Sequence, residues 1–105
     1  MHRLFILLGL LSIAGTAAAQ DVGNPSAGRE LASQWCSDCH DIAPSGQGSR
    51  GRAPAFAEVA RMPSATALSL SVFLRTSHGN MPNVMLSPDQ SDNLVAYILS
   101  LKSAR

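Results

Sequence analysis

Two cysteines and a histidine form the densest group of chemically capable residues in this 105-residue chain. Residues 36–40 read Cys-Ser-Asp-Cys-His, so two residues separate Cys36 from Cys39 and His40 follows directly. Thiolates are nucleophiles and soft metal ligands, and an imidazole nitrogen binds transition metals. Because the three groups fall within five residues, they can act on one ligand or on one metal centre.

The spacing C-x-x-C-H is the attachment signature of a c-type haem. Two thiols separated by two residues can reach the two vinyl groups of one porphyrin and form thioethers. The histidine after the second cysteine is then carried beneath the iron, where an imidazole nitrogen can bind it. The pattern therefore predicts one covalently attached haem c, with Cys36 and Cys39 holding the ring and His40 holding the iron.

Three other chemistries of the same residues stay open beside this interpretation. A thioredoxin-like redox motif is expected within a βαβ unit, and the sequence contains no such pattern. A zinc site needs four ligands, and beyond the two cysteines the chain after residue 20 offers only His40 and His78. A disulfide between Cys36 and Cys39 would close a very short loop and constrain the unfolded chain little.

The first 19 residues have the three-part pattern of a secretory signal peptide. His2 and Arg3 precede an uncharged apolar run, residues 4–14, and three alanines at 17–19 suit a signal peptidase. The run is shorter than the roughly 20 residues that a spanning helix needs. We expect cleavage after Ala19, a mature domain of residues 20–105, no spanning membrane segment and a periplasmic location. An uncleaved membrane anchor is the alternative.

The composition excludes several classes of protein. The chain has 8 Lys+Arg and 7 Asp+Glu, and removing Arg3 with the signal leaves seven of each sign. Nucleic-acid binders usually carry a clear basic excess, so we expect no nucleic-acid partner. The 46% of hydrophobic residues is too high for a disordered chain. So small a domain has a limited core, and a haem would supply additional apolar mass.

The residues around the motif follow helical patterns. Asn24 followed by Pro25 predicts a helix start, and residues 28, 31 and 35 then mark one face of that helix. Residues 87–90 read Ser-Pro-Asp-Gln, a capping box before apolar positions 94, 97 or 98, and 101. Residues 65–75 can form a third helix, and Pro54 can open a shorter one. No window shows strand alternation beside hairpin signals, so the predicted fold class is all-α.

Two segments lack a helical pattern, residues 41–53 and residues 76–86. Loops of this length in a small domain tend to be functional. The second loop contains Met81, which lies 41 residues after His40 and can reach the opposite face of a ring bound there. Pro82 stiffens the backbone beside Met81, and Gly79 lets the chain turn. We predict Met81 as the sixth iron ligand; the alternatives are His78, Met85 and Met62.

Four features together resemble a small, single-haem class I cytochrome c, across nearly the whole mature chain. They are the motif at residues 36–40, the proline within Ala-Pro-Ala-Phe at 53–56, the pair Met81-Pro82, and the final helix ending at 96–102. The resemblance implies a cytochrome c-like fold, in which three main helices wrap around one covalently bound haem. It also implies that Met81 is the sixth ligand.

The same resemblance implies two structural contacts. The first and last helices of that family cross near a glycine, and the match here is Gly28 against Leu94 and Tyr97. A glycine inside a helix costs about 1 kcal/mol relative to alanine, which a close approach of two backbones would explain. The backbone oxygen of Pro54 is the implied acceptor for the second N–H of His40.

The resemblance implies a single-electron carrier, not an enzyme. We expect a monomer that meets redox partner proteins transiently and whose association depends only modestly on salt, because its charges balance. The alternative is a haem-bearing subunit of a dehydrogenase complex or a haem gas sensor. Three arginines belong to segments that would border the haem propionates, but we interpret them as solvated surface charge and assign none to the site: Arg50, Arg52 and Arg61.

Overall fold

The structure is a computed structural model that describes residues 22–46, 53–76 and 79–103. Within these ranges the chain forms four helices and no strand: α1 (Pro25–Trp35), α2 (Phe56–Arg61), α3 (Ala67–Arg75) and α4 (Pro88–Ser100). The predicted all-α class is therefore confirmed. The expected signal peptide lies outside the described residues, as do Arg50, Arg52 and His78.

Side-chain caps explain where α1 and α4 begin. Asn24 Oδ1 accepts hydrogen bonds from the next backbone N–H groups of α1, those of residues 26 and 27. At α4 the Gln90 N–H donates to Ser87 Oγ at 3.2 Å, and the Ser87 N–H donates to Gln90 Oε1 at 2.9 Å. Both predicted starts are confirmed, because these acceptors satisfy N–H groups that the first turn leaves without partners.

The other two helices begin later than their patterns predict. The third helix starts at Ala67 instead of residue 65, because Thr66 is its N-cap and forms a capping box with Ser69. The short helix starts at Phe56 instead of Pro54, because Ala55 is extended and serves as its N-cap. Pro54 therefore stays in the preceding segment, where its carbonyl is free to accept a hydrogen bond.

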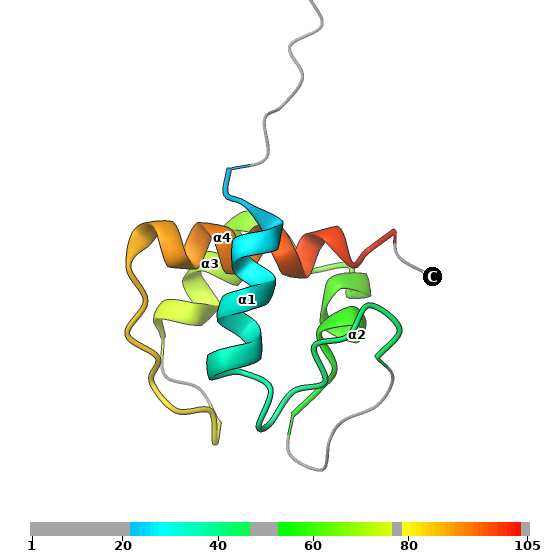
Figure 1. Cartoon of the computed structure of the whole chain (residues 1–105), viewed down its shortest axis with the longest axis horizontal. Coiled ribbons are helices and arrows are strands. Elements are labelled where there is room, and N and C mark those ends of the chain that lie inside the picture. Colours follow the sequence, from blue (N-terminus) through cyan, green and yellow to red (C-terminus); the bar gives the residue numbers. More distant parts are fainter. Residues whose placement is uncertain (1–21, 47–52, 77–78, 104–105) are drawn as a thin grey trace, which may run out of the picture.

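α1 crosses α4 at close range (Figure 1). A Cβ placed on Gly28 would lie 1.9 Å from the backbone oxygen of Asn93 and 2.8 Å from the Cβ of Tyr97. The implied contact between Gly28 and Tyr97 is confirmed, whereas the nearest neighbour is the Asn93 backbone and not Leu94. The backbones meet because no side chain separates them at Gly28.

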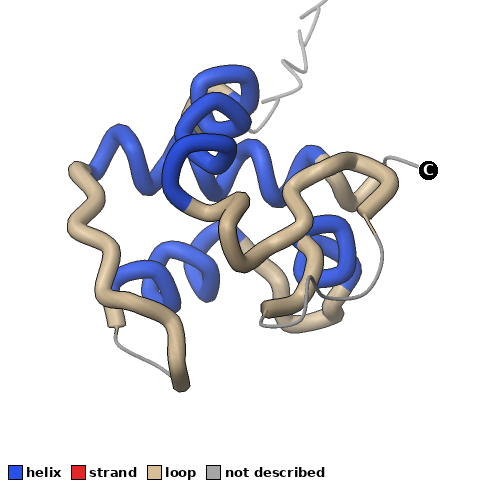
Figure 2. Tube along the Cα trace, turned by 60° about the horizontal axis from the view of Figure 1, so that its bottom comes forward, coloured by secondary structure: helices blue, strands red, loops and turns tan. Residues whose placement is uncertain are grey.

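α4 is the central element of the core, since it packs against each of the other three helices. Two loops, drawn in tan in Figure 2, run alongside the helices. They are the described residues before α2 (36–46 and 53–55) and the residues before α4 (79–87). No helix in the described part of the chain is long and apolar enough to cross a membrane. The buried cluster consists of Ala32, Cys36, Phe56, Ala57, Ala60, Leu70, Leu94, Val95, Tyr97, Ile98 and Leu101.

Candidate functional site

One cavity of about 1010 Å³ brings together all four site residues predicted from the sequence. Cys36, Cys39, His40 and Met81 each line its wall. The other lining residues are Trp35 and residues 53–54, 73, 79–80 and 82–85. Pockets for small molecules and cofactors typically measure roughly 300–1,000 Å³, so this cavity has room for a large cofactor.

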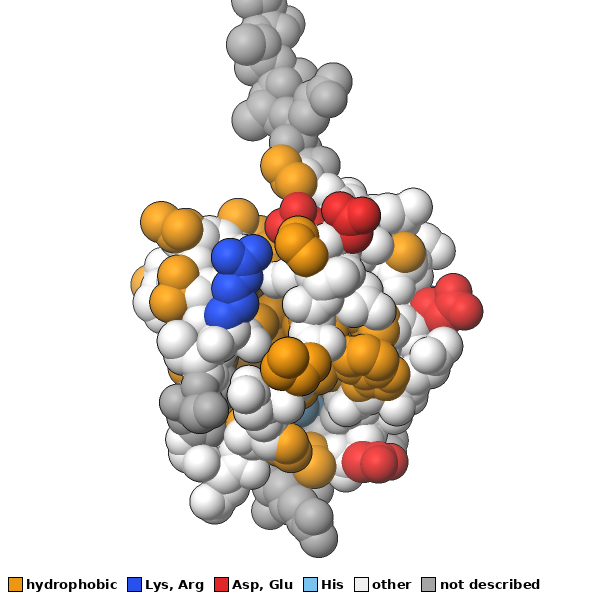
Figure 3. Space-filling view, turned by 90° about the vertical axis from the view of Figure 1, so that its left-hand side faces the viewer, with side chains coloured by type: hydrophobic (Ala, Val, Ile, Leu, Met, Phe, Trp, Pro, Cys, Tyr) orange, Lys and Arg blue, Asp and Glu red, His pale blue; other side chains and the backbone are white. Residues whose placement is uncertain are grey.

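The wall of this cavity is mainly apolar. Figure 3 shows hydrophobic side chains gathered around a hollow on one face of the molecule, with a histidine visible inside it. Three large wall side chains are unusually exposed, with Trp35 at 46%, Phe73 at 50% and Met85 at 82%. Single exposed apolar residues are ordinary, but several around one cavity mark a ligand site. The wall therefore fits a large apolar ring system such as a porphyrin.

The end of α1 places the two thiols and the imidazole. Cys36 caps the helix with an N–H that donates to the Ala32 oxygen. The chain then turns tightly, because the N–H groups of Cys39 and His40 both donate to the Cys36 oxygen, at 3.2 and 2.9 Å. These local bonds convert a spacing in the sequence into three side chains on the wall of one cavity.

The two cysteines can be compared with the disulfide, zinc and thioether interpretations of the motif. Both cysteines are free, so no disulfide joins Cys36 to Cys39. No group of three or more His, Cys, Asp or Glu within the described ranges is arranged to hold a metal ion. Burial raises the pKa of the Cys36 thiol to about 11. A buried thiolate is therefore unfavourable at neutral pH, whereas a thioether has no charge to bury.

The imidazole of His40 is oriented from two sides. Its Nδ1 lies 2.6 Å from the backbone oxygen of Pro54, the acceptor that the family resemblance implied. A carbonyl oxygen can only accept, so Nδ1 is the donor, and in the neutral imidazole Nε2 then has the lone pair that can bind a metal. The ring also packs against Phe56, with centroids 5.0 Å apart and planes tilted by 51°. This arrangement suits an imidazole that binds iron.

The structure narrows the candidates for the opposite ligand. Met81 is half-buried on the cavity wall, and Met85 lies on the same wall but is largely exposed. Met62 is 44% exposed and does not line the cavity, and neither does Arg61. His78 lies outside the described residues. Two thioethers thus remain in reach of the cavity.

Sequence reasoning did not assign two aromatic wall residues to the site. Trp35 was interpreted only as part of a helix face, although its position beside Cys36 was an available signal. Phe73 carried no such signal, because its place on the wall depends on how α3 packs. The aromatic part of the wall is therefore a finding of the tertiary structure.

Comparison with known proteins gives two matches. A family model described as "Cytochrome C oxidase, cbb3-type, subunit III" matches residues 23–98 of the chain. The cytochrome c-552 of Bradyrhizobium diazoefficiens (strain JCM 10833 / BCRC 13528 / IAM 13628 / NBRC 14792 / USDA 110) is 35% identical over 102 residues, which cover 97% of this chain and 95% of that protein. No solved structure gives a significant match. Both matches span the whole described cavity wall.

Proposed function

This chain belongs to the cytochrome c family, and on that premise we propose that it carries single electrons on one His/Met-ligated haem. Membership itself implies covalently bound haem c with its iron and a part in electron transport. In our proposal Cys36 and Cys39 form the two thioethers, and His40 and Met81 are the axial ligands. The bound haem supplies an iron that alternates between the ferric and ferrous states.

The observation that carries this proposal is that all four residues line the same mainly apolar cavity. The hydrogen bond from His40 Nδ1 to Pro54 supports its role, since it directs Nε2 away from that carbonyl and makes the imidazole more basic. A thioether opposite an imidazole favours ferrous iron and raises the reduction potential. The protein residues therefore act by holding, orienting and shielding one redox centre.

We further infer where and how the protein works. Residues 1–19 act as a signal peptide, and residues 20–105 function as a monomer in the periplasm. The pattern at the N-terminus supports this location, because attachment of a c-type haem outside the cytoplasm requires export. Partners are other redox proteins, which dock briefly.

The mass and visible spectrum of the protein from a periplasmic extract test the proposal. We expect a chain that begins at Gln20 with one haem added, a c-type ferrous spectrum, and a weak near-infrared sulfur-to-iron band in the ferric state. A Cys36→Ser, Cys39→Ser double variant should lose the added mass. Wild-type protein without covalent haem would contradict the proposal.

A second function, as a subunit of a larger redox complex, is favoured by one observation. The matching family model is described by the name of an oxidase subunit. Native electrophoresis of detergent extracts separates the two functions, because a subunit migrates with its complex and a free carrier migrates alone. Carbon monoxide titration of the ferrous protein covers the gas-sensor alternative. Ready binding of carbon monoxide at neutral pH would favour a sensor. In a carrier, Met81 should occupy the iron site that carbon monoxide would need.

A further inference from the structure

We propose that Tyr97 is a positioning residue for His40, acting through a hydrogen bond to the chain two residues beyond it. Tyr97 belongs to α4 and lies 55 positions from its partner, Ile42. The inference rests on the proposed ligation of iron by His40. It adds a second anchor for that ligand, provided by α4 and not by the segment that contains Pro54.

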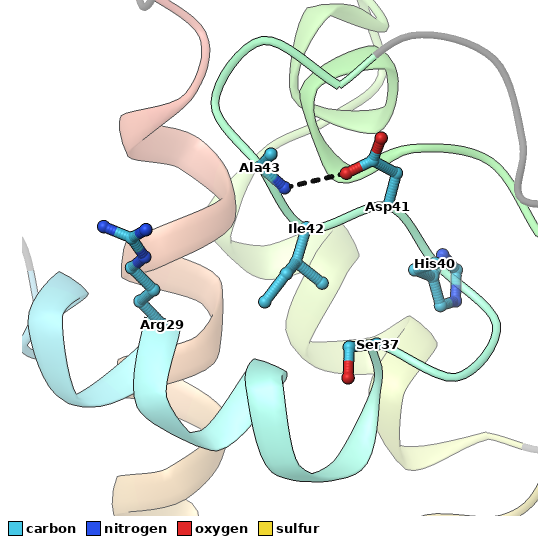
Figure 4. Close-up of a pocket in the computed structure, with 6 residues that line it drawn as sticks. All are labelled: Arg29, Ser37, His40, Asp41, Ile42 and Ala43. Atoms are coloured by element: carbon cyan, nitrogen blue, oxygen red, sulfur yellow. Dashed lines mark hydrogen bonds between the residues drawn. The ribbon is translucent and has the colours of Figure 1, made fainter.

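The segment that carries His40 has little support from its own secondary structure. α1 ends at Trp35, and residues 40–46 are irregular. A cavity of about 170 Å³ lies between residues 40–43, Arg29 of α1 and Ser37 in the turn that follows α1, and Ile42 points into this region (Figure 4). Packing against α1 is therefore incomplete, so hydrogen bonds carry more of the positioning.

Two such bonds hold the segment, one from the start of α2 and one from α4. The Phe56 N–H, at the start of α2, donates to the Asp41 oxygen at 2.9 Å. The Tyr97 hydroxyl donates to the Ile42 oxygen at 2.5 Å. Consecutive carbonyls are thus bound by α2 and by α4. Because His40 directly precedes these two carbonyls, we infer that both bonds help to keep His40 Nδ1 at 2.6 Å from the Pro54 oxygen.

Tyr97 is itself fixed by its surroundings. Its side chain is 4% exposed, and its Cβ lies directly against α1 at Gly28. Burial raises the pKa of its phenol, Arg29 opposes that shift and Asp41 adds to it. The hydroxyl therefore stays protonated at neutral pH and remains a hydrogen-bond donor. A rigid donor on the central helix is well suited to hold an irregular segment.

The expected consequence reaches the iron through the imidazole. A shorter bond from Nδ1 to the carbonyl makes the imidazole more basic, and a more basic ligand favours ferric iron. Removing the Tyr97 hydroxyl frees the Ile42 carbonyl, so the bond between His40 and Pro54 lengthens and opens more often. The reduction potential should then rise, and the Nδ1 proton should exchange faster with solvent.

The test compares Tyr97→Phe with Ile98→Val in the haem-loaded protein. Both substitutions weaken the buried face of α4, but Ile98→Val leaves the hydroxyl in place. NMR of the ferrous protein should show the His40 Nδ1 proton exchanging about two to ten times faster in Tyr97→Phe, as the loss of one hydrogen bond allows. The midpoint potential should rise in Tyr97→Phe only. No change in Tyr97→Phe, or equal changes in both variants, would overturn the proposal.

A fluorinated form of the same protein tests the direction in which the Nδ1 exchange rate and the potential change. Tyr97 is the chain's one tyrosine, so growth on 3-fluorotyrosine labels this position alone. Ring fluorine makes the phenol a stronger donor, so below neutral pH the Nδ1 exchange should slow and the potential should fall. A shift in the same direction as Tyr97→Phe, or no shift, would count against positioning by the hydroxyl. If wild-type protein lacks His40 ligation signals and the near-infrared band, the proposed function fails instead.

Discussion

Met81 and Met85 lie four residues apart in the sequence and line the same cavity wall. They differ in how much of each side chain is exposed to solvent. Met81 is half-buried, whereas Met85 is 82% exposed. A side chain that faces solvent is a poor choice for a ligand that must exclude water from iron. We therefore keep Met81 as the proposed ligand and treat Met85 as part of the cavity rim.

Met81→Ala should abolish the near-infrared band of the ferric protein and lower its reduction potential, because the thioether that favours ferrous iron is lost. Met81→His should restore six-coordination at a low potential. Near-infrared spectroscopy and potentiometry measure both effects.

Met85→Ala and His78→Ala are the matched controls for this assignment. Both should keep the band, and Met85→Ala should change the free energy of unfolding by less than about 0.5 kcal/mol, as expected for an exposed side chain. A buried methionine would instead cost ~2–5 kcal/mol. Loss of the band in Met85→Ala with its retention in Met81→Ala would move the ligand to Met85.

The phenol of Tyr97 makes stability depend on alkaline pH. Its pKa is raised in the folded protein, chiefly by burial, above the value of about 10 for an unfolded chain. The folded state therefore holds the proton more tightly, so this contribution is complete below pH ~10 and is lost as pH rises through the folded pKa. Denaturant titrations should show wild-type stability falling more steeply above pH ~10 than that of Tyr97→Phe. If stability fell equally with pH in wild type and in Tyr97→Phe, the raised pKa of Tyr97 would be contradicted.

At the scale of elements, the crossing of α1 and α4 depends on Gly28. A Cβ there would meet a backbone oxygen at 1.9 Å, and a backbone atom cannot rotate away. Gly28→Ala should therefore force the helices apart and lower the free energy of unfolding by about 3 kcal/mol, the upper end for overpacking. Gly79→Ala is the control: its φ of +51° is strained for alanine, but no atom lies within 4 Å of the new Cβ. It should cost only about 1 kcal/mol.

α4 also contains a buried hydroxyl whose removal should stabilise the fold. Ser91 is 1% exposed, and its Oγ has no hydrogen-bond partner in the described part of the chain. A buried polar group without a partner costs roughly 1–3 kcal/mol, and alanine is the better helix former. Ser91→Ala should raise the free energy of unfolding by about 1 kcal/mol. Ser100→Ala, which removes a bond to the Tyr97 oxygen, should have the opposite sign in the same denaturation assay.

At the scale of the whole molecule, the all-α, cytochrome c-like fold surrounds a cavity with an uncharged wall. No Asp, Glu, Lys or Arg among the described residues lines it, and residues 20–105 contain seven Lys+Arg and seven Asp+Glu. Electrostatic steering raises association rates by roughly 10–10³ where one sign dominates a surface. We therefore expect the second-order rate of reduction by a partner to change less than about tenfold between low and moderate ionic strength. A steeper fall in stopped-flow measurements would show a charged docking surface.

The sequence by itself determined the features that depend on neighbouring residues. The caps at Asn24 and Ser87 set the starts of α1 and α4, because a side chain and the N–H groups it binds lie within a few positions. The C-x-x-C-H motif at residues 36–40 could also be recognised from the sequence, because two intervening residues set the spacing of its thiols. The all-α class followed from helical periodicity.

Only the tertiary structure decided which distant groups meet. The bond of Tyr97 to Ile42, the place of Phe73 on the cavity wall and the exposure of Met85 all depend on how α1, α3 and α4 pack. The contact between His40 and Pro54 was anticipated by family resemblance alone, and the structure supplied its geometry. Such contacts join segments 14 to 55 residues apart, and no local preference specifies them. They form because burying the apolar faces of the helices together offsets the entropy of closing those loops.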